Sequence, residues 1–145
     1  MNFTAPVSAL MTQKLVTVEP SDPMSTVKEI FDTNLIHHIP VVKFRALVGI
    51  ISKSDFLHFL HGMETTPEDL AEEKGRLVRY KAEDIMTTGI ASLESTERVN
   101  VALQLFYENL FHAIPIVDNG ELVGILTTFD IIKVLVDEDN ARIKS

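Results

Sequence analysis

Apolar and polar positions follow one another along this chain in an order that occurs twice. Short apolar runs at Leu15 to Val18 and at Ile90 to Leu93 predict strands, each followed by polar residues where a helix can begin. Apolar residues then recur at helical spacing, which predicts an amphipathic helix in each half with its apolar stripe against a sheet. The positions that form these stripes are Val27, Ile30, Phe31 and Leu35, and Ala102, Leu105, Phe106 and Leu110.

A hairpin is predicted after each of these helices. The apolar segments Ile39 to Val42 and Ile114 to Val117 contain a proline, which suits the beginning or the edge of a strand. Asp118-Asn119-Gly120 predicts a tight turn before a further strand at Leu122 to Leu126, whereas Lys43-Phe44-Arg45 stands at the same place without glycine.

Each half is expected to close with a helix, Lys53 to Leu60 and Thr128 to Val136. The predicted order is therefore short helix, strand, helix, strand, strand, helix. Between the halves, Thr66-Pro67-Glu68-Asp69 has the residue order of a helix start, which predicts a connecting helix to about Tyr80, broken near Gly75. The residues after Val136 are expected to fray.

The two halves are copies of one unit. Positions 10 to 60 align with positions 85 to 135 at a constant offset of 75 without a gap, and 16 of these 51 positions are identical. The identities gather in Met-Thr, in His-x-Ile-Pro-x-Val and in Leu-Val-Gly-Ile-x-x-x-x-Asp. We expect a first repeat at 7–60, a linker at 61–81, a second repeat at 82–136 and a tail at 137–145.

Composition and charge exclude several classes of function. The chain has no cysteine, which excludes disulfide scaffolds, thiol catalysis and cysteine-based zinc sites. The net charge of −8, with no basic stripe, disfavours nucleic acid as a partner, although a small anion needs only local donors. The apolar stretches are too short to span a membrane and no secretory signal is recognised, so a cytoplasmic location is expected.

With these motifs in this order, the chain closely resembles a tandem pair of cystathionine β-synthase (CBS) domains from about Val7 to Val136. The resemblance implies an α/β (α+β) fold of two β-α-β-β-α repeats, packed sheet to sheet about a pseudo-twofold axis. It also implies clefts between the repeats that bind adenosine-containing ligands, and a regulatory sensor that is not an enzyme. AMP, ADP or ATP is the expected regulatory ligand, and no cofactor is required.

The ligand-binding residues are expected at matching places in the two repeats. A helix that begins after Ser52 or Thr127 presents free N–H groups to phosphate, with further donors from neighbouring side chains. Asp55 and Asp130 take the role that the family implies, accepting the hydroxyls of a ribose. The remaining candidates are an apolar wall for the purine, threonines near the base, histidines and polar neighbours: Thr12, Val16, His37, His38, Ile39, Pro40, Lys53, Ser54, Thr87, Ala91, His112, Ile114, Pro115 and Thr128.

Another interpretation of the same motif needs no ligand. Ser52-x-x-Asp55 and Thr127-x-x-Asp130 also fit a capping box, in which the side chains satisfy only backbone N–H groups. The residues alone leave both interpretations open, and the family resemblance favours binding in at least one cleft.

The histidines and Lys53 leave similar alternatives. His37, His38 and His112 either reach a phosphate or are structural, and a metal site that adds His58 and His61 lacks a spacing signature. Lys53 stands where the second repeat has Thr128, so the first repeat is expected to suit a di- or triphosphate and the second a less charged ligand.

Three functional classes follow. The favoured one is a regulatory module that binds an adenine nucleotide and acts on an unknown effector protein, with an S-adenosyl ligand as a variant. The second is a structural dimerisation module with empty clefts, and the third, an enzyme, lacks a recognisable nucleophile or glycine-rich phosphate loop. Because the closing helices are apolar on more than one face, a homodimer is expected, unless the linker helix covers that surface in a monomer.

Overall fold

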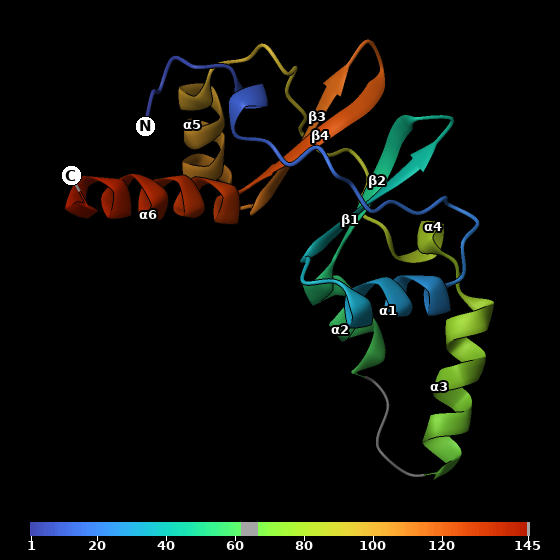
Figure 1. The fold of residues 1–145 in the computed structure, drawn as a ribbon. Coiled ribbons are helices and arrows are strands. Elements are labelled where there is room, and N and C mark those ends of the chain that lie inside the picture. Colours follow the sequence, from blue (N-terminus) through green and yellow to red (C-terminus); the bar gives the residue numbers. More distant parts are fainter. Residues whose placement is uncertain (62–66, 145) are drawn as a thin grey trace. The chain divides into compact units, whose positions relative to one another are not determined.

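The structure, a computed structural model, describes residues 1–61 and 67–144, and its mixed helices and strands occur in two similar sets (Figure 1). The chain divides into two compact units. Val16–Ile90 forms the central unit, and Met1–Leu15 together with Ala91–Ser145 forms the terminal unit. Across the described ranges, no helix is both long enough and apolar enough to cross a bilayer.

The central unit contains one antiparallel hairpin and its helices. In this hairpin Val41 faces Gly49 and a bulge follows, and a single parallel bridge joins Val18 to Val41. The helix α3 (Pro67–Arg79) packs against α1 (Met24–Thr33). The elements are α1 (Met24–Thr33), β1 (His38–Lys43), β2 (Ala46–Ser52), α2 (Lys53–Leu60), α3 (Pro67–Arg79) and α4 (Ala82–Ile85).

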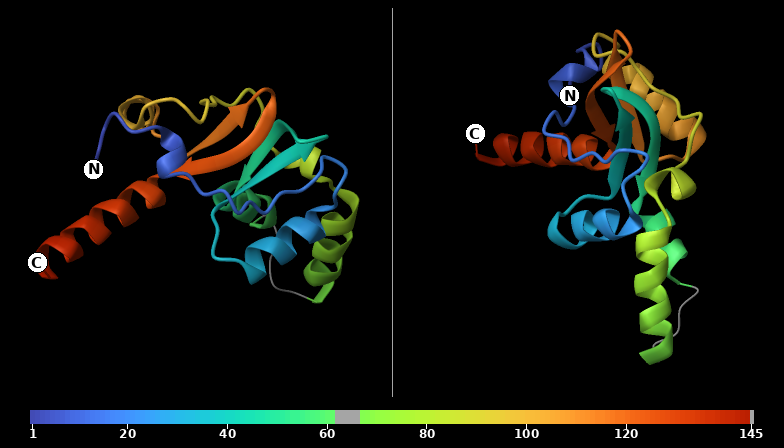
Figure 2. Two further views of the ribbon diagram at one scale, coloured as in Figure 1. Left: turned by 45° about the horizontal axis from the view of Figure 1, so that its top comes forward. Right: turned by 90° about the vertical axis from the view of Figure 1, so that its right-hand side faces the viewer.

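The terminal unit repeats this arrangement with the same register. Ile116 faces Gly124, the bulge follows at the equivalent place, and Leu93 forms the single parallel bridge. The last helix, α6 (Thr128–Lys144), extends away from the hairpin of this unit in all the views (Figures 1 and 2). The elements are η1 (Val7–Ala9), α5 (Val99–Asn109), β3 (Ala113–Asp118), β4 (Glu121–Thr127) and α6 (Thr128–Lys144).

Both hairpins turn through two residues with positive φ. Asn119 and Gly120 have φ values of 51° and 79°, in keeping with the predicted tight turn. Phe44 and Arg45, with φ values of 50° and 68°, adopt the same left-handed conformation without a glycine. The turn of the central unit therefore stores backbone strain that the turn of the terminal unit avoids.

The Met-Thr segment of each repeat pairs with the hairpin of the other repeat. The backbone N–H of Thr12 donates to the carbonyl of Ile125 at 2.8 Å, and that of Ile125 donates back at 3.0 Å. Thr87 and Ile50 form the equivalent pair at 2.9 and 3.0 Å. Each compact unit is therefore completed by a short segment that the sequence places with the other repeat.

The glycine of each Leu-Val-Gly-Ile motif makes room for this segment. A Cβ atom at Gly124 would lie 2.5 Å from the sulfur of Met11, and one at Gly49 would lie 2.5 Å from the sulfur of Met86. Real Cβ atoms do not approach other atoms so closely, so a side chain here would displace the methionine. The Gly and Met identities of the repeats thus reflect one packing contact.

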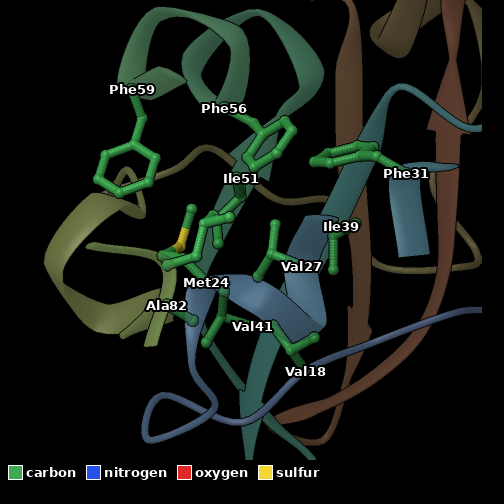
Figure 3. Packing of buried hydrophobic residues seen from close by; sticks show 11 residues of the cluster. Val18, Met24, Val27, Phe31, Ile39, Val41, Ile51, Phe56, Phe59 and Ala82 are labelled. Atoms are coloured by element: carbon green, nitrogen blue, oxygen red, sulfur yellow. The ribbon is translucent and has the colours of Figure 1, made fainter. Parts of the chain in front are cut away.

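Each unit has its own hydrophobic core. In the central unit Ile39, Val41 and Ile51 of the hairpin meet Met24, Val27 and Phe31 of α1 and Phe56 and Phe59 of α2 (Figure 3). The core of the terminal unit is built by Val7, Val99, Ala102, Ile114, Ile116, Leu126 and Ile131. The predicted amphipathic helices and hairpins are confirmed, because α1, α5 and both strand pairs supply these cores.

Several predictions about local structure are wrong. Leu15 to Val18 and Ile90 to Leu93 form no strand, and only one bridge remains in each. Leu35 and Leu110 are 104% and 81% exposed, because α1 ends before Leu35 and Leu110 adopts a left-handed conformation at the end of α5. Beyond the ends of the helices, helical spacing no longer places a residue on the apolar stripe.

The linker and tail also differ from expectation. α3 runs through Gly75 without a break, since Leu77 two residues later is buried in the central core and offsets the cost of glycine, about 1 kcal/mol. Thr66, the predicted capping residue, lies outside the described residues. Residues 137–144, predicted to fray, continue α6, where Arg142 pairs with Asp139 at 2.8 Å.

Candidate ligand-binding sites

The Ser-x-x-Asp motif of the central unit lies at the beginning of α2. Ser52 is the N-cap residue, and its hydroxyl oxygen accepts a hydrogen bond from the backbone N–H of Asp55 at 3.0 Å. The N–H of Lys53 donates to the carbonyl of His37 at 2.7 Å, which holds the histidine segment beside the helix start. The carboxylate of Asp55 is exposed and has no hydrogen-bond or ion-pair partner among the described residues.

The equivalent motif of the terminal unit forms a complete capping box. The N–H of Asp130 donates to the Thr127 hydroxyl at 3.2 Å, and the Asp130 carboxylate accepts from the N–H and hydroxyl of Thr127 at 2.9 and 3.1 Å. The other carboxylate oxygen accepts from the hydroxyl of Thr12 at 3.0 Å. The N–H of Thr128 donates to the carbonyl of His112, as in the central unit.

The two motifs therefore differ in what their carboxylates already do. Capping bonds are present at both helix starts: Thr127 and Asp130 form both bonds of a capping box, whereas between Ser52 and Asp55 only the Ser52 hydroxyl acts as a cap. Capping and binding are compatible in the central unit, because the cap there uses the N–H of Asp55 and leaves its carboxylate available. In the terminal unit a ligand must replace an existing hydrogen bond of Asp130.

A cavity in the central unit brings Asp55 and Thr87 together. It has a volume of about 480 Å³ and lies between α2, α3 and α4, with Thr87 on its wall. Arg76 of α3 and Asp84 of α4 also line it, and neither was a candidate from the sequence. No motif points to them, since only the packing of the linker helix brings them beside Asp55.

The apolar candidates are mostly core residues. Ile39 and Ile114 have no exposed surface, and Pro40 and Pro115 are equally buried, so all four support the hairpins from inside. Val16 is half-buried and Ala91 is exposed.

The polar candidates lie near the surface. His37, His112 and Ser54 are exposed, whereas Lys53 is half-buried, as is His38, which already has a partner. Among the described residues, no group of three or more histidines and carboxylates could hold a metal ion.

These observations define the class of the protein: a pair of repeated α/β units, each with a hairpin and a capped helix whose first turn carries an aspartate. The model of the CBS domain matches this chain twice, at residues 7–62 and 82–137. The chain belongs to the CBS domain family.

Three proteins illustrate the similarity. Inosine-5'-monophosphate dehydrogenase of Thermoplasma acidophilum is 28% identical over 85% of this chain, and the chain spans only 22% of that enzyme. The structure of the CBS-pair protein CBSX2 from Arabidopsis thaliana gives a TM-score of 0.77 at 24% identity, covering 94% of this chain and 98% of the other. CBSX2 has also been solved in complex with AMP, with a TM-score of 0.75.

The third is the CBS domain pair of protein MJ0100, solved with 5'-methylthioadenosine and S-adenosyl-L-methionine. It gives a TM-score of 0.72 at 23% identity, covering 93% of this chain and 98% of the other. At such identities the two solved structures show the shared fold. Solved proteins with this fold thus bind adenosine-containing ligands.

Proposed function

We propose that this chain is a regulatory module that binds an adenosine-containing ligand and changes its affinity for an effector protein in response. The observation that carries the proposal is the exposed Asp55 carboxylate, which has no partner among the described residues and lies on the wall of a cavity that it shares with Thr87. An exposed carboxylate without a partner can accept hydrogen bonds from both hydroxyls of a ribose at little desolvation cost.

Two ligand classes fit this site. Adenine nucleotides, AMP, ADP or ATP, would place phosphates near the start of α2, where Ser52, Lys53 and Ser54 supply a hydroxyl, an ammonium and a further hydroxyl. S-adenosyl compounds share the adenosine and need no phosphate donors. The complexes of CBSX2 with AMP and of MJ0100 with S-adenosyl-L-methionine support both classes for a protein of this fold.

The two units are expected to bind with different affinities. A ribose at Asp130 must displace the hydroxyl of Thr12, which donates to that carboxylate at 3.0 Å, whereas a ribose at Asp55 displaces only water. The central unit is therefore the stronger site in this proposal.

Isothermal titration calorimetry with AMP and with S-adenosylmethionine tests the proposal. Asp55→Asn should weaken the tighter binding event by more than about tenfold, since the amide supplies only one acceptor oxygen for two ribose hydroxyls. The matched control is Asp32→Asn on α1 of the same unit, which removes the same charge but breaks only an exposed ion pair with Lys28. Equal affinities for wild type and both variants would contradict the assignment of Asp55.

A structural dimerisation module is the second candidate. It is favoured by the capping bonds, which give Ser52, Thr127 and Asp130 a structural role without a ligand. If no adenosine compound binds at millimolar concentration, this candidate is preferred over the sensor. We propose no catalytic role for this chain.

A further inference from the structure

The cavity beside Asp55 is lined by both acidic and basic side chains, and a ribose alone would not need all of them. α2 contributes His58 and Phe59 next to Asp55, α3 contributes Arg76, and α4 contributes Asp84. Its volume of about 480 Å³ lies within the usual range for small-molecule pockets, roughly 300 to 1,000 Å³. There is room for a further polar group of a ligand next to the sugar.

Arg76 is held in position by aromatic rings. Its guanidinium carbon lies 4.9 Å from the ring centre of Phe59 and 5.6 Å from that of Tyr80, and the two rings meet edge to face at 5.6 Å. Such stacking holds the guanidinium over the rings while leaving its N–H donors free. No carboxylate among the described side chains, which exclude residues 62–70, forms an ion pair with Arg76. The side chain is therefore placed for a planar anionic group of a ligand, such as a carboxylate.

Asp84 supplies a negative charge to the same cavity. One of its carboxylate oxygens accepts a hydrogen bond from the N–H of Lys81 at 2.9 Å, and the second oxygen has no partner among the described residues. In a formal count that takes histidine as uncharged, the described residues of the lining contribute two carboxylates and one guanidinium, which is one net negative charge. Asp55, His58 and Asp84 all line the cavity, but no group of three or more such side chains in the described part of the chain is arranged to hold a metal ion.

This charge balance discriminates between the two ligand classes. A phosphate group would bring about two negative charges against two carboxylates and a single guanidinium. S-adenosylmethionine carries one net positive charge, from its sulfonium and ammonium groups less its carboxylate, and so neutralises the lining. Lys53, on which the expectation of a polyphosphate rests, does not line this cavity.

We propose that the ligand of the central unit is an adenosyl compound that ends in an α-amino acid, with its carboxylate bound by Arg76 and its ammonium bound by Asp84. The proposal rests on the proposed function and narrows its ligand class. Arg76 and Asp84 distinguish this ligand from adenosine compounds without the amino-acid end, while Asp55 holds the ribose that all of them share.

The test is calorimetric titration of wild type, Arg76→Gln and Arg79→Gln with S-adenosylmethionine and with 5'-methylthioadenosine, which lacks the amino acid. Arg79 is the matched control, since it also lies on α3 and stacks on Tyr80 at 5.6 Å but does not line the cavity. We expect Arg76→Gln to lower the affinity for S-adenosylmethionine by about tenfold or more. The affinity for 5'-methylthioadenosine should stay within about twofold of that of wild type. Arg79→Gln should leave both ligands unchanged.

Asp84→Asn gives a second, independent readout. Its amide oxygen can still accept from Lys81, so the fold is kept while one negative charge of the lining is removed. This variant should bind S-adenosylmethionine more weakly than wild type does and bind AMP more tightly. Thermal melting of each variant without ligand verifies that it is folded.

The outcomes separate this inference from the function on which it rests. If wild type binds S-adenosylmethionine no more tightly than 5'-methylthioadenosine, or if Arg76→Gln and Arg79→Gln act alike, the amino-acid subsite is refuted while the adenosine sensor stands. If no adenosine compound binds wild type, both are refuted. Selective loss of S-adenosylmethionine affinity in Arg76→Gln supports both.

Discussion

Two aspartates at equivalent positions have different consequences for stability. Asp130 closes a capping box and accepts from Thr12, whereas the side chain of Asp55 makes no hydrogen bond among the described residues. We expect Asp130→Ala to lower the free energy of unfolding by about 1 to 2 kcal/mol and Asp55→Ala to change it by less than about 0.5 kcal/mol. Urea denaturation without ligand measures both, and equal losses would contradict the difference between the two sites.

A third carboxylate responds to pH. The hydrogen bond from the Ser95 hydroxyl at 2.5 Å, followed by that from the Ser95 N–H at 2.9 Å, lowers the pKa of Asp118 below its ordinary value of 3.8. Because the folded pKa is the lower one, the stabilisation is complete above the unfolded pKa and is lost as the pH falls through the folded one. Asp118→Asn should therefore have a lower free energy of unfolding than wild type near neutral pH. The difference between the two free energies should become smaller below about pH 4. Denaturation curves measure both free energies, and a difference that stays constant down to pH 2 would contradict the proposed dependence of stability on the ionised Asp118.

Among the elements, the pairing of each Met-Thr segment with a hairpin depends on one glycine. Gly124→Ala would place its Cβ 2.5 Å from the sulfur of Met11 and 3.1 Å from the carbonyl of Thr12, so we expect a loss of about 1 to 3 kcal/mol. Gly75 is the matched control, since nothing lies within 4 Å of its Cβ position on α3. Gly75→Ala should stabilise the protein by about 0.5 to 1 kcal/mol. Opposite shifts of the two melting midpoints are the expected result, and two stabilised variants would contradict the packing argument.

For the whole molecule, ligand binding should be visible as stabilisation. A ligand at about 100 times its dissociation constant adds roughly 2.7 kcal/mol, which corresponds to an increase in melting midpoint of about 5 to 11 °C for a chain of this length. Differential scanning fluorimetry with adenosine compounds measures it. Asp55→Asn should reduce the shift, and an unchanged shift in that variant would place the main site elsewhere.

Assembly is the other property at this scale. Five apolar side chains of α6 are about half exposed or more, with exposed fractions of 68% for Phe129, 56% for Ile132, 49% for Leu135, 51% for Val136 and 71% for Ile143. We expect such a surface to meet a second copy, giving a mass near 32 kDa, about twice the 16.2 kDa of one chain. Light scattering coupled to size exclusion measures this mass. Ile132→Asp should convert the dimer to monomer, whereas a wild-type mass near 16 kDa at micromolar concentration would exclude it.

Local patterns in the sequence determined much of this molecule. The offset of 75 between the repeats, the amphipathic helices, the Asn119-Gly120 turn and the capping residues Ser52 and Thr127 all follow from residues a few positions apart. Such features depend on backbone preferences and on side chains that reach only their own neighbours. They could be predicted, and the structure confirms them.

Tertiary packing alone decided which segments meet. Thr12 and Asp130 are 118 positions apart, yet the hydroxyl of Thr12 donates to that carboxylate, because a Met-Thr segment lies on the hairpin of the other repeat. Likewise only the packing of α3 on α1, with Leu77 in the core, brings Arg76 beside Asp55. Periodicity shows that a helix has an apolar face but not which surface will cover it, since burial is non-directional. For that reason the capped aspartates could be found from the sequence, and the groups that surround them could not.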